Sequence, residues 1–282
     1  MGKIEQETIF IMKKYNISAN KSLGQNFLVD DNVVDGIVKS AEVTEDDLII
    51  EIGPGLGTLT AKLLERAGKV IAIELDQRMI KILKERFILY KNFEIINNDV
   101  LKINLNEIIE KNLNNNLKKV KVVANLPYYI TTPIIMKLLE DRLNIESITV
   151  MVQKEVAKRL TACDGDKLAG AITYSVKYYC EAKEEIEVPK DCFIPSPEVD
   201  SEVIKLVLRK EPFVKVNDED KLFKLIKTSF MQRRKTFING IANGGLTSKE
   251  KIKEILINLN IDENVRGENL SLEQFAQISN LL

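Results

Sequence analysis

The chain has 282 residues, 45% of them apolar, with a formal net charge of -1 and a sequence pI of about 5.9. This length allows a sizeable core and predicts one large and one small domain, while the near-neutral charge gives no global sign of a polyanionic partner. Histidine is absent, which excludes Ser-His and Cys-His catalysis and histidine-metal sites.

The first part of the chain predicts two helices separated by a loop. Apolar spacing places a short helix over about residues 4–11, and the loop follows as NKSLGQNFLVD, residues 20–30. The second helix runs from about Asp31 to Ala41, where Asp30 or Asp31 can act as N-cap.

From Asp47 onward, short apolar runs alternate with helices, which predicts a parallel sheet covered on both faces. The expected strands are 47–53, 69–75, 93–99, 120–126 and 147–153, and the expected helices lie near 57–67, 76–89, 104–112 and 133–140. A basic helix then begins at Lys154. An extended segment over 172–188 and a strand over 201–210 are expected to close the sheet as an antiparallel pair, giving about seven strands.

Beyond Lys210 the strand pattern stops, and three helices are predicted over residues 220–240, 248–260 and 271–282. Ser248 and Ser271 open the last two as N-caps. We therefore predict two domains, an α/β domain over residues 1–210 and a helical domain over residues 211–282.

A glycine-rich loop, IIEIGPGLGTLT, joins the first core strand to the next helix. Gly53, Gly55 and Gly57 allow positive φ and close approach of a ligand to the backbone. A dinucleotide site wants its third glycine three residues after the second, a position that Thr58 occupies here. The spacing therefore disfavours a pyrophosphate site, and an ordinary tight strand-to-helix turn is the alternative.

Acidic residues follow the next two strands at positions suited to a nucleoside. Glu74 comes 21 residues after Gly53, where a carboxylate can accept from ribose hydroxyls, and Asp99 is suited to accept from an adenine amine. Either acid alone could be a helix cap. Together with the glycine loop they predict a nucleoside cofactor without pyrophosphate, which fits S-adenosylmethionine.

The fourth strand ends in NLPYY, residues 125–129. The side-chain carbonyl of Asn125 and the backbone carbonyl of Leu126 can accept both hydrogens of an exocyclic purine amine and turn its lone pair toward a methyl group. Pro127 stiffens the turn, and Tyr128 offers a face for an unstacked base. The alternative is a strand-ending turn in which Asn125 caps and the tyrosines pack.

These motifs, with KSLGQNFLVD, MVQKEVAKRL, FIPSPEVDSEVIKL and FMQRRKTFIN, resemble the small-subunit ribosomal RNA adenine N6,N6-dimethyltransferase family over nearly the whole chain. The resemblance implies a seven-stranded Rossmann-like methyltransferase sheet with helices on both faces and a small all-α C-terminal domain. It also implies transfer of two methyl groups from S-adenosylmethionine to each of two adjacent adenosines in the 3′-terminal hairpin loop of 16S rRNA, within the immature small ribosomal subunit.

The resemblance adds further site residues. It implies that Asn26 and Leu28 touch the cofactor together with Gly53, Gly55, Glu74, Asp99 and Asn125, and that Phe193 supplies a second aromatic face for the adenine. Where family members carry Tyr-Gly followed by Leu-Ser, this chain has Ala169, Gly170, Ile172 and Thr173. This departure concerns RNA contacts rather than the chemistry.

Two basic clusters are candidates for RNA binding. Lys154, Lys158 and Arg159 lie on the predicted basic helix, and Arg233, Arg234 and Lys235 form a run near the C-terminus. Such groups supply affinity for phosphate but little sequence discrimination, and ordinary solvated faces are the alternative. Lys21 is a weaker candidate.

Cysteine use and hydropathy bear on location. Cys163, Cys180 and Cys192 are an odd number without CxxC spacing, which favours a reducing compartment. No apolar run reaches 18 residues, and the N-terminus carries charge throughout, unlike a signal peptide. We expect a cytoplasmic monomer that uses neither metal nor membrane.

Three other functions stay open on the sequence alone. The nearest is a methyltransferase acting on large-subunit rRNA or on DNA adenine, although Leu126 and the helical tail favour the small-subunit substrate. A protein that only checks subunit assembly and a nicotinamide oxidoreductase are the other two.

Overall fold

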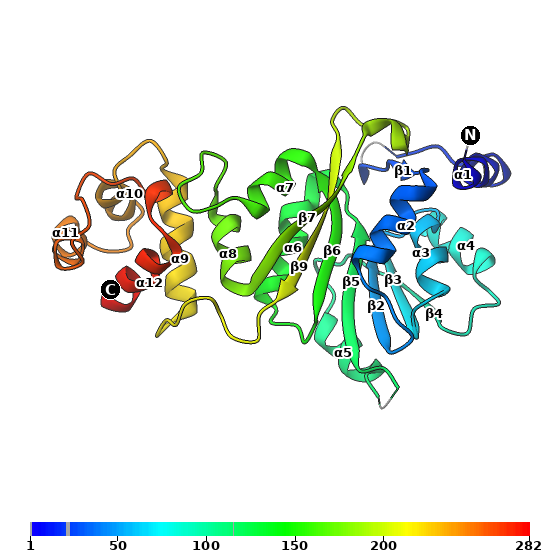
Figure 1. Cartoon of the computed structure of the whole chain (residues 1–282), viewed down its shortest axis with the longest axis horizontal. Helices are drawn as coiled ribbons and strands as arrows, with labels where there is room; N and C mark the ends of the chain where they lie inside the picture. The colour runs from blue at the N-terminus through cyan, green and yellow to red at the C-terminus, as the bar shows by residue number, and fades with distance from the viewer. Residues whose placement is uncertain (1, 21–22, 115) are drawn as a thin grey trace. The chain divides into compact units, whose positions relative to one another are not determined.

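The computed structural model describes residues 2–20, 23–114 and 116–282, which form two compact units (Figure 1). The first unit holds the residues up to Ala157 and 183–208, and the second holds 158–182 and 209–282. The division into domains 1–210 and 211–282 stays a prediction. Lys21, the weaker RNA candidate, lies outside the described residues.

A seven-stranded sheet organises the first unit, in the strand order β4-β3-β2-β5-β6-β9-β7. The first five strands in this order are parallel, and β9 runs antiparallel to β6. The strands are β2 (Asp47–Ile52), β3 (Lys69–Glu74), β4 (Phe93–Asn97), β5 (Lys119–Asn125), β6 (Ser147–Gln153), β7 (Cys180–Val188) and β9 (Ser201–Leu208). The predicted α/β sheet of seven strands is thereby confirmed.

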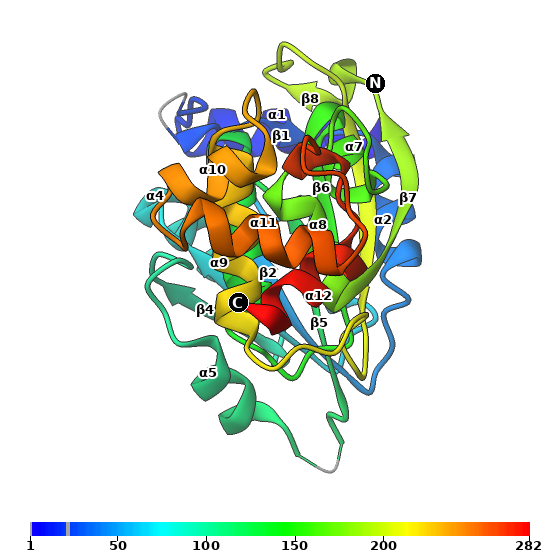
Figure 2. The same ribbon diagram turned by 90° about the vertical axis from the view of Figure 1, so that its left-hand side faces the viewer.

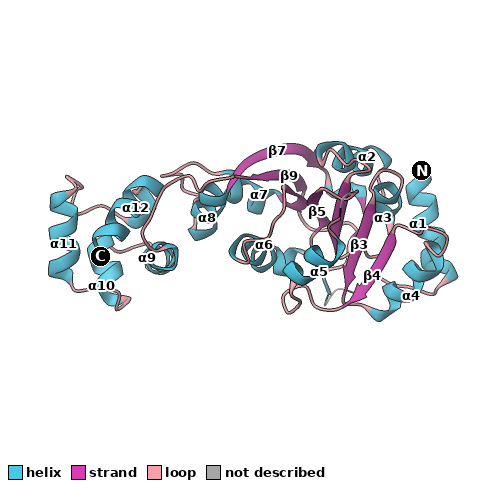
Figure 3. Cartoon of the chain, turned by 90° about the horizontal axis from the view of Figure 1, so that it is seen from below, coloured by secondary structure: helices cyan, strands magenta, loops and turns pink. Residues whose placement is uncertain are grey.

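Helices lie on both faces of this sheet, with α2 on one side and α5 and α6 on the other (Figure 3). The helices up to the end of the parallel sheet are α1 (Lys3–Lys14), α2 (Asp31–Ser40), α3 (Thr58–Leu64), α4 (Gln77–Arg86), α5 (Leu105–Asn112), α6 (Thr131–Glu140) and α7 (Lys154–Thr161). The Asp30 side chain accepts from the N–H groups of Asn32 and Val33, which confirms Asp30 as the N-cap of α2.

A small second sheet pairs β1 (Phe27–Leu28) with β8 (Phe193–Ile194) in antiparallel fashion, Leu28 opposite Phe193. The sequence did not predict this pair, because two-residue strands have no periodicity to read. Its consequence is that the loop before α2 is bound to a segment more than 160 residues further along the chain.

The second unit is helical and has its own apolar core (Figure 2). Its helices are α8 (Ala171–Tyr179), α9 (Glu219–Met231), α10 (Phe237–Asn243), α11 (Lys249–Asn258) and α12 (Leu272–Leu281). The hydroxyls of Ser248 and Ser271 accept from the N–H groups of Lys251 and Gln274, which confirms both predicted N-caps.

Residues 172–179 are helical rather than extended, so the sequence prediction for them was wrong. Their β-branched and aromatic side chains are typical of strands. In the structure Tyr174 and Tyr178, four residues apart, are both buried in the helical core, as expected for one face of a helix. Thr173 Oγ1 accepts from the Gly170 N–H at 2.9 Å where α8 begins. Tertiary packing therefore outweighs the local preference.

The expected helix over 220–240 is also wrong as a single element, since it is divided into α9 and α10. Gln232 leaves helical geometry with φ -126° and ψ 49°, and Thr236 precedes α10 with an extended backbone, ψ 153°. The Lys235 N–H donates to Gln232 O at 2.8 Å and closes a turn between the helices. Arg233, Arg234 and Lys235 thus lie on a turn, not along a helix face.

A buried ion pair links the beginnings of β2 and β5. Lys121 Nζ lies 2.9 Å from Asp47 Oδ2, and the two side chains are 5% and 0% exposed. Lys121 also donates to the Glu42 carbonyl at 2.7 Å, and Asp47 accepts from both the N–H and the hydroxyl of Thr44. The pair therefore anchors the turn that enters the sheet.

Replacing Lys121 with Ala should lower the free energy of unfolding by about 3–5 kcal/mol, because it leaves the Asp47 carboxylate buried without a counter-charge. Urea denaturation followed by circular dichroism measures the change. Lys118→Ala is the matched control, since Lys118 pairs with Asp46 at 3.2 Å on the surface and should cost no more than about 1 kcal/mol. Equal losses in the two variants would contradict the expectation.

Candidate functional site

A pocket of about 130 Å³ lies at the carboxyl ends of the parallel strands. Four segments line it: the loop before α2, the glycine loop after β2, the ends of β3 and β4, and the turn after β5. The predicted site residues that line it are Asn26, Leu28, Gly53, Gly55, Glu74, Asp99, Asn125, Leu126, Pro127 and Tyr128. Residues up to 102 apart in sequence are thus brought together by the parallel strand order.

The glycine loop adopts the geometry predicted from its spacing. Gly53, Gly55 and Gly57 have φ of +67°, +57° and +86°, a region that disfavours other residues. Gly57 is also required by packing, because a Cβ there would lie 2.7 Å from the side chains of both Leu83 and Phe87. Gly53 and Gly55 instead keep the backbone beside the pocket free of side chains.

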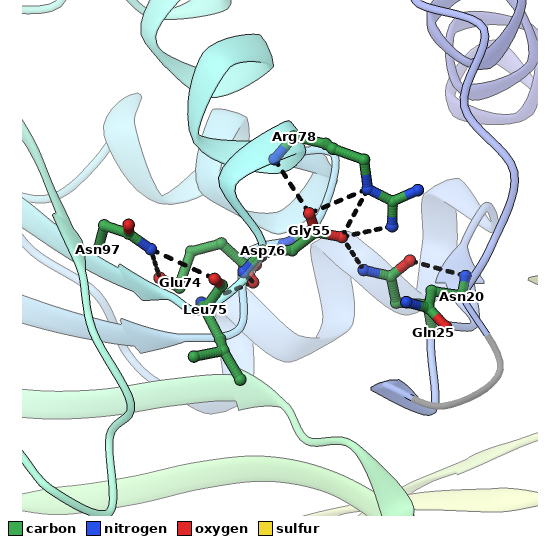
Figure 4. Close-up of polar contacts among 8 residues, drawn as sticks. All are labelled: Asn20, Gln25, Gly55, Glu74, Leu75, Asp76, Arg78 and Asn97. Atoms are coloured by element: carbon green, nitrogen blue, oxygen red, sulfur yellow. Dashed lines mark hydrogen bonds and ion pairs between the residues drawn. The ribbon is translucent and has the colours of Figure 1, made fainter.

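Glu74 ends β3 as a buried carboxylate held by the backbone (Figure 4). Oε1 accepts from the N–H groups of Leu75 and Asp76 at 2.8 Å each, and Oε2 accepts from the Gly55 N–H at 3.1 Å. Burial nevertheless raises the pKa of Glu74, while these backbone bonds oppose the rise. A carboxylate has about four acceptor positions, so roughly one remains for a ligand.

A polar network fastens the loop before α2 to the turn after β3, and the sequence did not predict it (Figure 4). Gln25 donates to Asp76 Oδ2 at 3.0 Å and accepts from the Asn20 N–H at 2.9 Å. Arg78 completes the network with an ion pair of 2.6 Å to Asp76 and lowers the pKa of that carboxyl. The network therefore positions the loop that carries Asn26.

Asp99 lies at the pocket after β4, as predicted. Its Oδ1 accepts from the Leu101 N–H at 3.0 Å, and its Oδ2 is 3.8 Å from Lys102 Nζ. The side chain is 28% exposed. Asp99 therefore both caps the following turn and presents a carboxylate oxygen toward the pocket.

The NLPYY turn places an amide at the end of β5. Asn125 Nδ2 donates to the Asn26 carbonyl at 3.4 Å, a bond that orients the side-chain oxygen away from Asn26 and leaves it available to a ligand. Tyr128 OH and Ser201 Oγ are 2.6 Å apart, which ties the ring to β9. Tyr129, 55% exposed, also lines the pocket, with its ring against Gly24.

Phe193 is not among the residues that line the pocket. It is 3% exposed and packs in the core of the first unit, opposite Leu28 in the β1–β8 pair. The exposed aromatic ring at the pocket is that of Tyr129, which the sequence reading treated as packing.

Glu51 is a second acidic residue of the pocket that the sequence analysis missed. It lies on β2 between Ile50 and Ile52, and burial raises its pKa to about 8. A single carboxyl within a run of buried apolar residues is the signal that could have drawn attention to it.

The two basic clusters differ in how far their charges are engaged. Lys154 pairs with Glu187 at 3.0 Å, and Arg233 pairs with Glu268 at 3.1 Å and donates to the Lys167 carbonyl. Within the described part of the chain, no hydrogen bond or ion pair engages the side chains of Lys158, Arg234 and Lys235, which are exposed. The Arg159 carbonyl accepts from Thr173 Oγ1.

Two further searches covered the described residues alone. No group of three or more His, Cys, Asp or Glu side chains is placed to hold a metal ion. No helix combines the length and apolar character needed to cross a membrane.

Comparisons with known proteins agree with this geometry. The family described as ribosomal RNA adenine dimethylase matches residues 16–282. The ribosomal RNA small subunit methyltransferase A of Bacillus pumilus (strain SAFR-032) is 50% identical over 275 residues, covering 96% of this chain and 94% of that protein. The protein of the same description from Clostridioides difficile (strain 630) is 48% identical over 272 residues, covering 96% and 93%.

Solved structures give the same picture for the fold. A dimethyladenosine transferase from Plasmodium falciparum has a TM-score of 0.74 and 28% identity, covering 89% of this chain and 95% of that one. The 23S rRNA methyltransferase ErmE has a TM-score of 0.67 and 25% identity, covering 91% and 99%. The predicted Rossmann-like methyltransferase fold is thereby confirmed.

Replacing Glu51 with Gln should change how stability depends on pH. With a pKa near 8 when folded and 4.5 as its ordinary value, Glu51 holds a proton in the folded chain that the unfolded chain has lost. Between these values its contribution to stability therefore falls as pH rises, by about 1.4 kcal/mol per pH unit. Urea denaturation at pH 5, 6 and 7 should show the variant gaining on the wild type by this slope. Parallel curves would mean that Glu51 is ionised in the folded state.

Proposed function

Since the chain belongs to the ribosomal RNA adenine dimethylase family, we propose that it methylates N6 of two adjacent adenosines in the hairpin loop near the 3′ end of small-subunit rRNA. S-adenosylmethionine is the methyl donor and the immature small subunit in the cytoplasm is the setting. One observation supports this most directly: the amide of Asn125 lies in the same pocket as Gly53 and Glu74.

The pocket residues fit S-adenosylmethionine. Glu74 has an acceptor position for a ribose hydroxyl, and Asp99 presents an oxygen suited to the adenine amine. The positive φ of Gly53 and Gly55 keeps side chains away from the ligand, and Asn26 and Leu28 line the pocket from the other side. When bound, the cofactor supplies an activated methyl group on a positively charged sulfur.

The NLPYY turn acts on the acceptor base. Asn125 Oδ1 and the Leu126 carbonyl accept the two N6 hydrogens, so the nitrogen lone pair points at the methyl group instead of conjugating with the ring. Pro127 stiffens the turn that joins them. Catalysis then consists of positioning and electrostatics, and each amine proton is lost as its methyl group is gained.

An aromatic face must receive the adenine once it leaves its stack in the RNA loop. Tyr128 is partly buried and held by Ser201, so its ring is fixed before a base arrives. For Phe193 to supply the second face, it has to leave the core in which it is 3% exposed. Tyr129 is already exposed at the pocket and can contact a flanking base without such a change.

RNA affinity comes from the basic clusters. Lys158, Arg234 and Lys235 carry charges that no protein partner engages among the residues described, so they can meet phosphates without breaking an ion pair. Lys154 and Arg233 must exchange Glu187 and Glu268 for phosphate, which reduces their net gain. Arg159 adds a further cation on α7.

The alternative substrates are addressed by the relatives. ErmE, named for 23S rRNA, shares the fold at 25% identity, whereas the relatives at 48–50% identity are named for the small subunit. The higher similarity favours the small-subunit substrate. The glycine spacing disfavours a nicotinamide oxidoreductase, and a protein that only checks assembly needs no acceptor-facing amide.

Replacing Asn125 with Ala should lower methyl transfer to unmethylated small subunits by about 100-fold or more, because one of two groups that orient the amine is lost. Primer extension across the 3′ hairpin loop reports the modified adenosines. RNA binding should stay within twofold of the wild type, and Asn116→Ala, at an exposed asparagine, is the matched control. Full activity in the Asn125 variant would remove the assigned role, and wild-type protein that gives no cofactor-dependent stop would remove the substrate.

Replacing both Arg234 and Lys235 with Ala should weaken RNA binding in a salt-dependent way. Each lost phosphate contact reduces the slope of log K against log salt by roughly 0.7 to 0.9, so the double variant should lose about 1.5. Filter binding between 50 and 300 mM KCl measures this slope. Lys81→Ala with Lys84→Ala, at exposed lysines of α4, is the control, and an unchanged slope in the first variant would contradict the assignment.

A further inference from the structure

The pocket contains one carboxyl group to which the proposed reaction gives no part. Glu51 lines the pocket, is 1% exposed, and has an Oε2 atom without a hydrogen-bond partner among the described residues. Leaving a buried polar atom unpaired costs free energy. An orphaned carboxyl at a ligand pocket therefore points to a ligand that completes its bonding.

The surroundings of Glu51 contain no counter-charge. Thr60 of α3 lies nearby with its own buried hydroxyl lacking a regular partner, and no Lys or Arg of the described chain forms an ion pair with Glu51. Glu74 of β3 is the charged group that acts on it. Burial raises the pKa of Glu51, the Thr60 hydroxyl counters part of the rise, and the negative charge of Glu74 adds to it. In the free protein at neutral pH the carboxyl is thus mainly neutral.

Glu51 and Glu74 are prepared for different ligands. Glu74 accepts three backbone N–H bonds that support a negative charge, and it needs only a neutral donor such as a hydroxyl to complete its shell. Glu51 accepts no such bond, so a neutral donor would leave its charge costly. A cation, by contrast, would favour the ionised form.

The strand order indicates which part of the ligand reaches Glu51. Across the sheet the order is β4, β3, β2, β5, and these strands carry Asp99, Glu74, Glu51 and Asn125 in turn. With adenine at Asp99, ribose at Glu74 and the methyl acceptor at Asn125, the methionine portion of the cofactor comes to β2. That portion holds the positively charged sulfur and the positively charged amino group.

We propose that Glu51 is the counter-charge for the cationic methionine portion of S-adenosylmethionine, and that it releases a proton to solvent as the cofactor binds. The inference rests on the proposed function, because it takes this cofactor as the ligand. It makes Glu51 a cofactor-binding residue whose charge appears only in the complex.

Isothermal titration calorimetry of the full-length protein tests this. Titrations with S-adenosylmethionine at pH 6.5 are run in buffers of different ionisation enthalpy, and the slope of the observed enthalpy against that quantity counts the protons released. The wild type should release close to one proton, and its affinity should rise up to tenfold per pH unit between pH 5.5 and 7.5. Glu51→Gln should release none and bind with no such rise. Glu110→Gln, at an exposed glutamate of α5, should behave as the wild type.

Two related ligands identify the cation. S-adenosylhomocysteine keeps the amino group but has a neutral sulfur, and 5′-methylthioadenosine lacks both charges. Proton release with S-adenosylhomocysteine assigns the amino group to Glu51, and release with S-adenosylmethionine alone assigns the sulfur. Release with 5′-methylthioadenosine would overturn the proposal, because no cation is then involved.

The remaining outcomes separate this inference from the proposed function. Wild-type protein that binds S-adenosylmethionine without releasing a proton at pH 5.5–7.5 overturns the role of Glu51 and leaves the methyltransferase proposal intact. Wild-type protein that does not bind the cofactor at all overturns both. Because the wild-type measurement decides alone, the test stands even where Glu51→Gln fails to fold.

Discussion

Parallel alignment of the central strands is the constraint on which the site depends. Since β2, β3, β4 and β5 run in one direction, their carboxyl ends meet at one edge, and each contributes a single polar residue there. The glycine loop then keeps the backbone low enough for a ligand to reach all of them. No pair of these residues is adjacent in sequence, so the chemistry depends on the register of the sheet.

Much of this arrangement could be predicted from the sequence because its signals are local. The apolar runs, the positive-φ glycines and the acids after β3 and β4 all have short-range patterns, and the structure places them as expected. The parts that could not be predicted depend on distant partners. Gln25 meets Asp76 across 51 residues, and the β1–β8 pair spans more than 160, so neither leaves a trace in a sequence window.

The two wrong elements failed for opposite reasons. Residues 172–179 have the composition of a strand, and a helical core formed by residues much further along the chain overrides it. Residues 220–240 have a continuous helical pattern, and a local break at Gln232 and Thr236 interrupts it. The second error matters more for function, because it moves three cations from a helix face to an exposed turn.

The β1–β8 pair has a consequence for how variants of the aromatic segment are interpreted. Phe193 lies opposite Leu28, which itself lines the pocket. Truncating the phenylalanine would therefore open a void behind the cofactor loop as well as delete a ring. A slow enzyme carrying such a truncation would report on loop placement as much as on base stacking, and a larger Michaelis constant for the cofactor would be the sign of the former.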